Sequence, residues 1–95
     1  MAKFQDLSDA IIKGDNTASK EIAEKLVHFG CESSDLVSGV GEFCVRGGLL
    51  DVFPYESLYP IRIEFFGDII ETIRSFDIIN QRSQKNLDQI AILPP

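Results

Sequence analysis

The stretch Ile61-Arg-Ile-Glu-Phe-Phe-Gly-Asp68 decides the fold, because its side chains alternate like those of a strand and it ends on a turn signal. Successive strand side chains point to opposite faces, which here are Ile61, Ile63 and Phe65 against Arg62, Glu64 and Phe66. An aromatic beside an arginine and a glutamate is typical of a protein-binding hot spot. The alternative is that a neighbouring loop covers Phe66. The second face of this strand is therefore either a contact surface or a packing layer.

Composition indicates a soluble globular domain. The chain has 95 residues, enough for one domain with one core, and is 44% hydrophobic and 25% charged. Its net charge of −6 argues against direct nucleic-acid binding, although a local basic patch could form from Arg46, Arg62, Arg74 and Arg82. No long apolar segment or signal-peptide pattern is present, so we expect a cytoplasmic protein with no membrane partner.

One amphipathic helix is predicted near the N-terminus. Apolar residues at helical spacing place it over residues 18–29, with Thr17 as its N-terminal cap and Gly30 ending it in the left-handed conformation. Before it, residues 4–13 read as a short helix or an extended lead-in. His28 falls in the last turn and has no nucleophile or metal ligand near it in sequence, which indicates a structural or solvated residue.

A hairpin is predicted after Gly41, where the hydrophobic period changes to two. The dipeptide Gly47-Gly48 supplies a two-residue turn that pairs Val45 with Leu50 and Phe43 with Val52 toward the core. A phosphate cradle is the alternative for this dipeptide, but the P-loop pattern and a following helix are missing. The opposite face of the hairpin holds Cys44, Arg46, Leu49 and Asp51, and we expect a surface salt bridge between Arg46 and Asp51.

The remaining segments complete an α+β fold, with an N-terminal helix packed on a small, mainly antiparallel β-sheet built from hairpins. Residues 69–76 form a strand only if a bulge between Ile70 and Ile73 lets both point inward. The other expectations are a loop over residues 31–40 in which Leu36 and Val37 begin to pair with the sheet, a loop over 54–60 whose aromatics pack on the sheet edge, a polar turn-like segment over 77–86 and a last strand over 87–93. Pro94-Pro95 then marks a domain boundary.

Catalytic and metal-binding patterns are missing from the sequence. Cys31 and Cys44 fit neither a metal-ligand nor a redox spacing, so we interpret both as free thiols, with a disulfide between them as the alternative. No acid pair or nucleophile with a base appears. The chain therefore reads as a binding or structural module that needs no cofactor, and its candidate contact residues are Arg46, Arg62, Glu64 and Phe66.

Four phrases of the sequence resemble, in the same order and with similar gaps, the second domain of the excision-repair protein UvrB. They are similar above all to the matching domain of transcription-repair coupling factors (Mfd), because of Arg-Gly-Gly-Leu-Leu-Asp and Gln-Arg-Ser. The resemblance covers about residues 17 to 95. The phrases are Gly41-Glu-Phe-Cys-Val-Arg-Gly-Gly-Leu-Leu-Asp-Val-Phe-Pro54, Pro60-Ile-Arg-Ile-Glu-Phe-Phe-Gly-Asp68, Ile73-Arg-Ser-Phe-Asp77 and Gln81-Arg-Ser83.

The resemblance implies a UvrA-docking domain over residues 17–95, preceded by a lead-in from another domain over residues 1–16. It implies contacts through Arg46, Arg62, Glu64 and Phe66. It further implies a larger parent that hydrolyses ATP with magnesium and meets RNA polymerase and DNA through other domains. The sequence departs from the UvrB pattern at Cys44, where an arginine is usual, at Cys31-Glu-Ser-Ser34, where a tyrosine-led basic stretch is usual, and at Ile69, where an acid is usual.

Two other interpretations remain open at this point. The chain could be the equivalent docking domain of UvrB itself. It could also be an unrelated small α+β domain that binds a ligand or nucleic acid. A ligand-dependent rise in melting temperature, or salt-dependent binding of DNA, would identify that second class.

Overall fold

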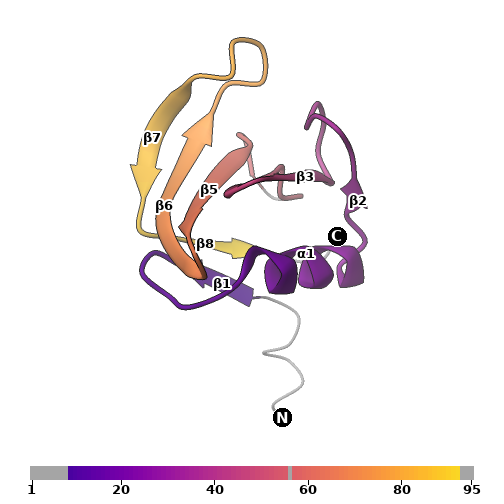
Figure 1. The fold of residues 1–95 in the computed structure, drawn as a ribbon. Helices are drawn as coiled ribbons and strands as arrows, with labels where there is room; N and C mark the ends of the chain where they lie inside the picture. Colours follow the sequence, from indigo (N-terminus) through magenta and orange to yellow (C-terminus); the bar gives the residue numbers. More distant parts are fainter. Residues whose placement is uncertain (1–8, 56, 93–95) are drawn as a thin grey trace.

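The computed structural model describes residues 9–55 and 57–92, which form two sheets and a helix (Figure 1). Six strands make the larger sheet in the order β2-β3-β4-β5-β6-β7, and β1 pairs with β8 in a separate ribbon. The bounds are α1 (Ser19–His28), β1 (Asp9–Ile12), β2 (Glu32–Ser33), β3 (Glu42–Arg46), β4 (Leu49–Val52), β5 (Ile61–Phe66), β6 (Ile69–Phe76), β7 (Ser83–Leu87) and β8 (Gln89–Ile92).

The core lies between the inner face of the larger sheet and the layer formed by α1 and the β1–β8 ribbon (Figure 1). Ile22 and Leu26 of α1 supply the helical stripe, and alternate residues of β3 to β6 supply the sheet side. A helix packed on a sheet was predicted, and the structure is richer in strand than that prediction. The sheet is also mixed, because β2 runs parallel to β3 while the other neighbouring pairs are antiparallel.

Two local predictions of register are confirmed. The turn at Gly47 and Gly48 pairs Val45 with Leu50 and Phe43 with Val52. In the next hairpin, Glu64 lies opposite Thr72 and Phe65 opposite Ile70, so Glu71 is an extra residue on β6. This bulge lets Ile70 and Ile73 both point into the core, where both are buried.

The helix ends as predicted but begins differently. Gly30 has φ +95°, and the N–H groups of Gly30 and Cys31 donate to the carbonyls of Val27 and Leu26 in a Schellman motif. The prediction that Thr17 caps the helix is wrong. Ala18 occupies the N-cap position in an extended conformation and makes no side-chain hydrogen bond. The helix therefore begins at Ser19, one residue later than a cap at Thr17 would place it.

Three loop predictions need correction. Sheet pairing after the helix occurs at Glu32–Ser33 and not at Leu36 and Val37, since Val37 instead packs against Cys44 and Phe53. The predicted turn over 77–86 is shorter, because residues from Ser83 onward form β7. That edge strand exposes both faces, so it lacks the alternation that would have revealed it. The predicted strand over 87–93 breaks at Asp88, where the chain leaves the larger sheet and joins β1 as β8.

Only part of the predicted lead-in lies within the described residues. Residues 1–8 and 93–95 lie outside them, which includes the first half of the segment 4–13 and the Pro94-Pro95 boundary. Asp9–Ile12 is the extended alternative, paired with β8, and Ile11 belongs to the core. A domain division at residues 16 and 17 stays a prediction.

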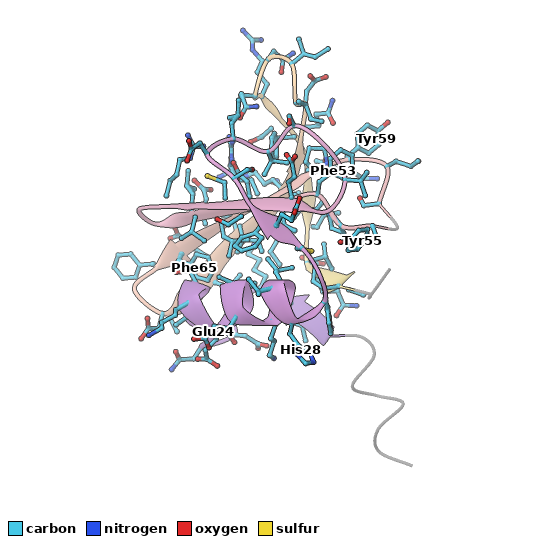
Figure 2. All side chains as sticks on the ribbon, turned by 90° about the vertical axis from the view of Figure 1, so that its right-hand side faces the viewer. Glu24, His28, Phe53, Tyr55, Tyr59 and Phe65 are labelled. Carbon is cyan, nitrogen blue, oxygen red and sulfur yellow. The ribbon has the colours of Figure 1, made fainter. Side chains whose placement is uncertain are left out.

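The face of the sheet that points away from α1, here called the outer face, is partly buried as well. Cys44 packs with Val37 and Phe53 in a second small cluster, and Asp51 is only 2% exposed. The predicted salt bridge between Arg46 and Asp51 is confirmed as a pair, but Asp51 is not a surface residue, because the loops that follow β2 and β6 cover this end of the face. In Figure 2, Phe53, Tyr55 and Tyr59 lie toward one side of the molecule and Phe65 lies toward the other.

The loop over residues 54–60 delivers the chain to β5 with its aromatics in different settings. Tyr55 packs against the core, and its hydroxyl donates to the carbonyl of Gly30 at 3.0 Å. Tyr59 and Leu58 are exposed. The prediction that the aromatics of this loop pack back on the fold therefore holds for Tyr55 alone.

Candidate protein-binding face

Register places the predicted contact residues on one face of three neighbouring strands. Arg46, Leu49 and Glu64 lie opposite one another across β3, β4 and β5. Arg62 is in the adjacent row, and Phe66 continues the same side of β5 toward its end. The outer face therefore brings together all four predicted residues, but in different environments.

Asp51 is the centre of the outer face. Its carboxylate accepts two hydrogen bonds from Arg62, from Nε at 2.8 Å and from Nη2 at 2.9 Å. It also accepts a longer bond from Nη2 of Arg46 at 3.4 Å. A buried carboxylate needs such partners, since an unpaired charge away from water costs several kcal/mol. Asp51 thus holds two of the four predicted contact residues, Arg46 and Arg62, in place.

Arg62 is consequently a largely enclosed residue, with 15% of its side chain exposed. Its guanidinium stacks over the ring of Phe76 at 4.4 Å from the centroid. The hydrogen bonds to Asp51 raise the pKa of Arg62 above its usual value, so the side chain stays charged at any working pH. Arg46 differs, because half of its side chain reaches solvent.

Glu64 is held by β6. Its carboxylate pairs with the guanidinium of Arg74, and Oγ1 of Thr72, directly across the strand pair, donates to the same oxygen. About one third of each charged side chain of this ion pair is exposed. Glu64 therefore presents its carboxylate in a set orientation at the edge of the enclosed cluster.

Phe66 is open to solvent, with 75% of its surface exposed. It lies opposite Ile69 across the tight turn that Gly67 makes at φ +61°, and Ile69 is exposed too. Of the two alternatives for Phe66, the one in which a neighbouring loop covers it is wrong, and its role as a contact residue stays a prediction. A large aromatic on a short hairpin is an apolar contact point whose backbone is already ordered.

Asp51 itself was not predicted as part of the site. The signal was present in the sequence, because Asp51 interrupts the apolar run Leu49-Leu50-Asp51-Val52-Phe53. A lone acid in such a run indicates a buried charge that requires a partner on a neighbouring strand. Arg74 and Gln81 complete the cluster and were missed for a different reason, since their contacts depend on register and loop conformation.

Other kinds of site have little support in the described residues. Within 9–55 and 57–92, no three His, Cys, Asp or Glu side chains gather as metal ligands. The ten residues of α1 are too few to cross a bilayer. Cys31 and Cys44 are free thiols, as predicted, and both are buried, which raises the pKa of the Cys31 thiol. The four arginines do not form a basic patch, because Arg46, Arg62 and Arg74 each pair with an acid.

Comparison with known proteins is consistent across most of the chain. Residues 10–95 match the family model described as UvrB interaction domain. The transcription-repair-coupling factor of Bacillus subtilis (strain 168) is 43% identical over 81 residues, which is 85% of this chain and 7% of that protein. The factor of Myxococcus xanthus is 40% identical over 94 residues, 99% of this chain and 8% of that protein. The chain thus spans less than a tenth of the length of these relatives.

Proposed function

Because this chain belongs to the UvrB interaction domain family, we propose that it is a docking module that recruits UvrA to a transcription-repair coupling factor. Phe66 carries the proposal. It is the exposed aromatic of a hairpin whose neighbouring charges are already held by the fold. Binding to such a surface costs little ordering entropy, so burial of the ring contributes directly to affinity.

The four predicted residues take different roles in this proposal. Phe66 enters an apolar pocket of UvrA, and Arg46 meets an acidic or carbonyl group of the partner with its exposed guanidinium. Glu64 accepts from a partner donor through the oxygen that Arg74 leaves free. Arg62 contacts the partner only through the small exposed part of its side chain, and the rest of the side chain holds the outer face together through Asp51. The module binds and positions, and we assign it no catalytic step and no cofactor of its own.

ATP, magnesium, RNA polymerase and DNA belong, in this proposal, to other parts of the parent protein. The relatives are more than ten times longer than the segment they share with this chain. The cytoplasm is the compartment expected for such a repair factor.

Titration of UvrA with the chain and with Phe66→Ala tests the proposal. Truncating a hot-spot aromatic usually weakens the binding free energy by more than about 1 kcal/mol, and a tenfold rise in Kd corresponds to about 1.4 kcal/mol. Phe66→Ala should therefore weaken binding of UvrA by a loss of this size. Arg46→Gln removes an exposed charge and lowers affinity by a smaller factor. Arg62→Ala is a poor probe, because it also unpairs the buried carboxylate of Asp51.

The matched controls are Tyr59→Ala, an exposed aromatic of the loop before β5, and Lys20→Gln, an exposed charge on α1. Both should bind UvrA like the unmodified chain. Equal affinity for all variants, with melting temperatures unchanged, would rule out the outer face as the docking surface.

A further inference from the structure

The loop between β6 and β7 is ordered by hydrogen bonds among its own residues. The carboxylate of Asp77 accepts from the N–H groups of Ile79 at 2.7 Å and Asn80 at 3.3 Å. Two backbone hydrogen bonds of Asp77 close the loop: its carbonyl accepts from the N–H of Gln81 at 2.8 Å, and its N–H donates to the carbonyl of Arg82 at 3.0 Å. These bonds define one loop conformation.

Gln81 connects this loop to the outer face. Its backbone has φ +63°, and its side-chain amide donates to the carbonyl of Ile78 at 2.9 Å. Arg62 donates to Gln81 twice, to the backbone carbonyl at 3.3 Å and to the side-chain oxygen at 2.9 Å. A left-handed conformation is uncommon for a residue other than glycine, and the two bonds from Arg62 offset its cost. The guanidinium that binds Asp51 therefore also sets the loop.

The loop presents one apolar and one charged side chain that the fold does not use. Ile79 is 93% exposed, while its neighbour Ile78 packs against the second cluster. Arg82 is exposed and, within the part of the chain that the structure describes, forms no ion pair, unlike Arg46, Arg62 and Arg74. In Figure 1 the loop projects from the end of the sheet that lies farthest from α1.

We propose that the β6–β7 loop is a second contact element for the partner that docks on the outer face, with Ile79 entering an apolar pocket and Arg82 meeting an acidic rim. This inference rests on the docking function proposed above. Gln81 is a positioning residue that holds the loop through Arg62. The partner surface it implies is an apolar recess bordered by carboxylates, placed beyond the pocket for Phe66.

The two contact elements fit one interface. Phe66 and Arg62 are four residues apart on β5, about 13 Å at the usual strand rise, and Arg62 touches the loop directly. A standard interface covers about 800 Å² of each partner, so a single docking surface can reach both ends of the sheet. An isoleucine on an ordered loop adds to affinity because its burial needs little further ordering.

The test is titration of UvrA with Ile79→Ala and Arg82→Gln at low and moderate salt, with Phe66→Ala in parallel. Ile79→Ala should weaken binding about three- to tenfold, as expected for losing a buried apolar group. Arg82→Gln should weaken binding mainly at low salt and reduce the dependence of affinity on salt. Gln81→Ala should weaken binding, and adding Ile79→Ala to it should cost less than Ile79→Ala alone, because the loop is already displaced.

Leu58→Ala and Lys20→Gln are the matched controls. Leu58 is 87% exposed and belongs to the loop whose Ser57 and Tyr59 line a hollow with Ile61 and Ser75 of the inner face. Both controls should bind like the unmodified chain. If Phe66→Ala weakens binding while Ile79→Ala and Arg82→Gln do not, the second contact is wrong and the docking function stands. If Phe66→Ala has no effect either, the docking function itself fails.

Discussion

Asp51→Asn should be the most destabilising single change on the outer face, because it removes one charge of an enclosed ion pair. The substitution keeps the size of the side chain but turns an acceptor toward Arg62 into an amide. Arg62, 15% exposed, then retains its bonds to Gln81 and one acceptor at residue 51, but loses the second acceptor and the negative charge that neutralises it. Breaking a buried pair from one side costs about 3–5 kcal/mol, and the remaining contacts of Arg62 place this case near the lower value.

The free energy of unfolding from urea titrations measures this loss. A domain of this size has a total stability of about 5–15 kcal/mol, so a loss of about 3 kcal/mol is a large share. It corresponds to a fall in melting temperature of roughly 12 to 24 °C. Glu64→Gln is the control, since its ion pair with Arg74 is one third exposed and is worth less than about 1 kcal/mol.

A double-mutant cycle with Arg62→Met separates the pair from the single groups. If the buried charges matter through each other, the double variant loses less than the sum of the two single losses. Equal small losses for Asp51→Asn and Glu64→Gln, or strict additivity in the cycle, would show that Asp51 does not hold the outer face together.

Two further changes test the loops around the sheet. Gly41→Ala should destabilise the chain by about 1–3 kcal/mol, because Gly41 has φ +87° and a new Cβ would lie 3.0 Å from the ring of Tyr55. Gly47→Ala, also at positive φ but with open space around it, should cost less in the same urea titration. Hydrogen bonds from Ser38 lower the pKa of Glu42 in the folded state. The ionised carboxylate therefore stabilises the fold at pH values above the ordinary glutamate pKa of about 4.3. This stabilisation is lost as the pH falls through the lower pKa of the folded state. Glu42→Gln should therefore flatten the acid limb of a plot of unfolding free energy against pH.

The sequence was sufficient wherever local patterns determine structure. Period-two alternation and the Gly47-Gly48 turn predicted the register of β3 with β4. Ile70 and Ile73 are an odd number of residues apart, which a regular strand cannot place on one face, and this predicted the bulge. These features depend on neighbours in sequence. A residue cannot change its face without a slip of the whole strand, so such patterns leave little choice.

Long-range packing was what the sequence did not reveal. Whether the second face of a strand meets water depends on loops that cross it, so Asp51 was taken for a surface residue and Arg62 for an open contact. The polar strand β7 was missed because pairing with β6 and not its own pattern makes it a strand. Phe66 was undecided for the same reason, and its exposure followed only from the complete fold.

Hydrogen exchange of the chain with and without UvrA measures directly which face of the sheet UvrA covers. If UvrA docks on the outer face, exchange slows on binding in the turns at Gly47–Gly48 and Gly67–Asp68, which border that face around Phe66, and stays unchanged along α1 on the opposite side of the sheet. Slower exchange along α1 with both turns unaffected would contradict docking on the outer face.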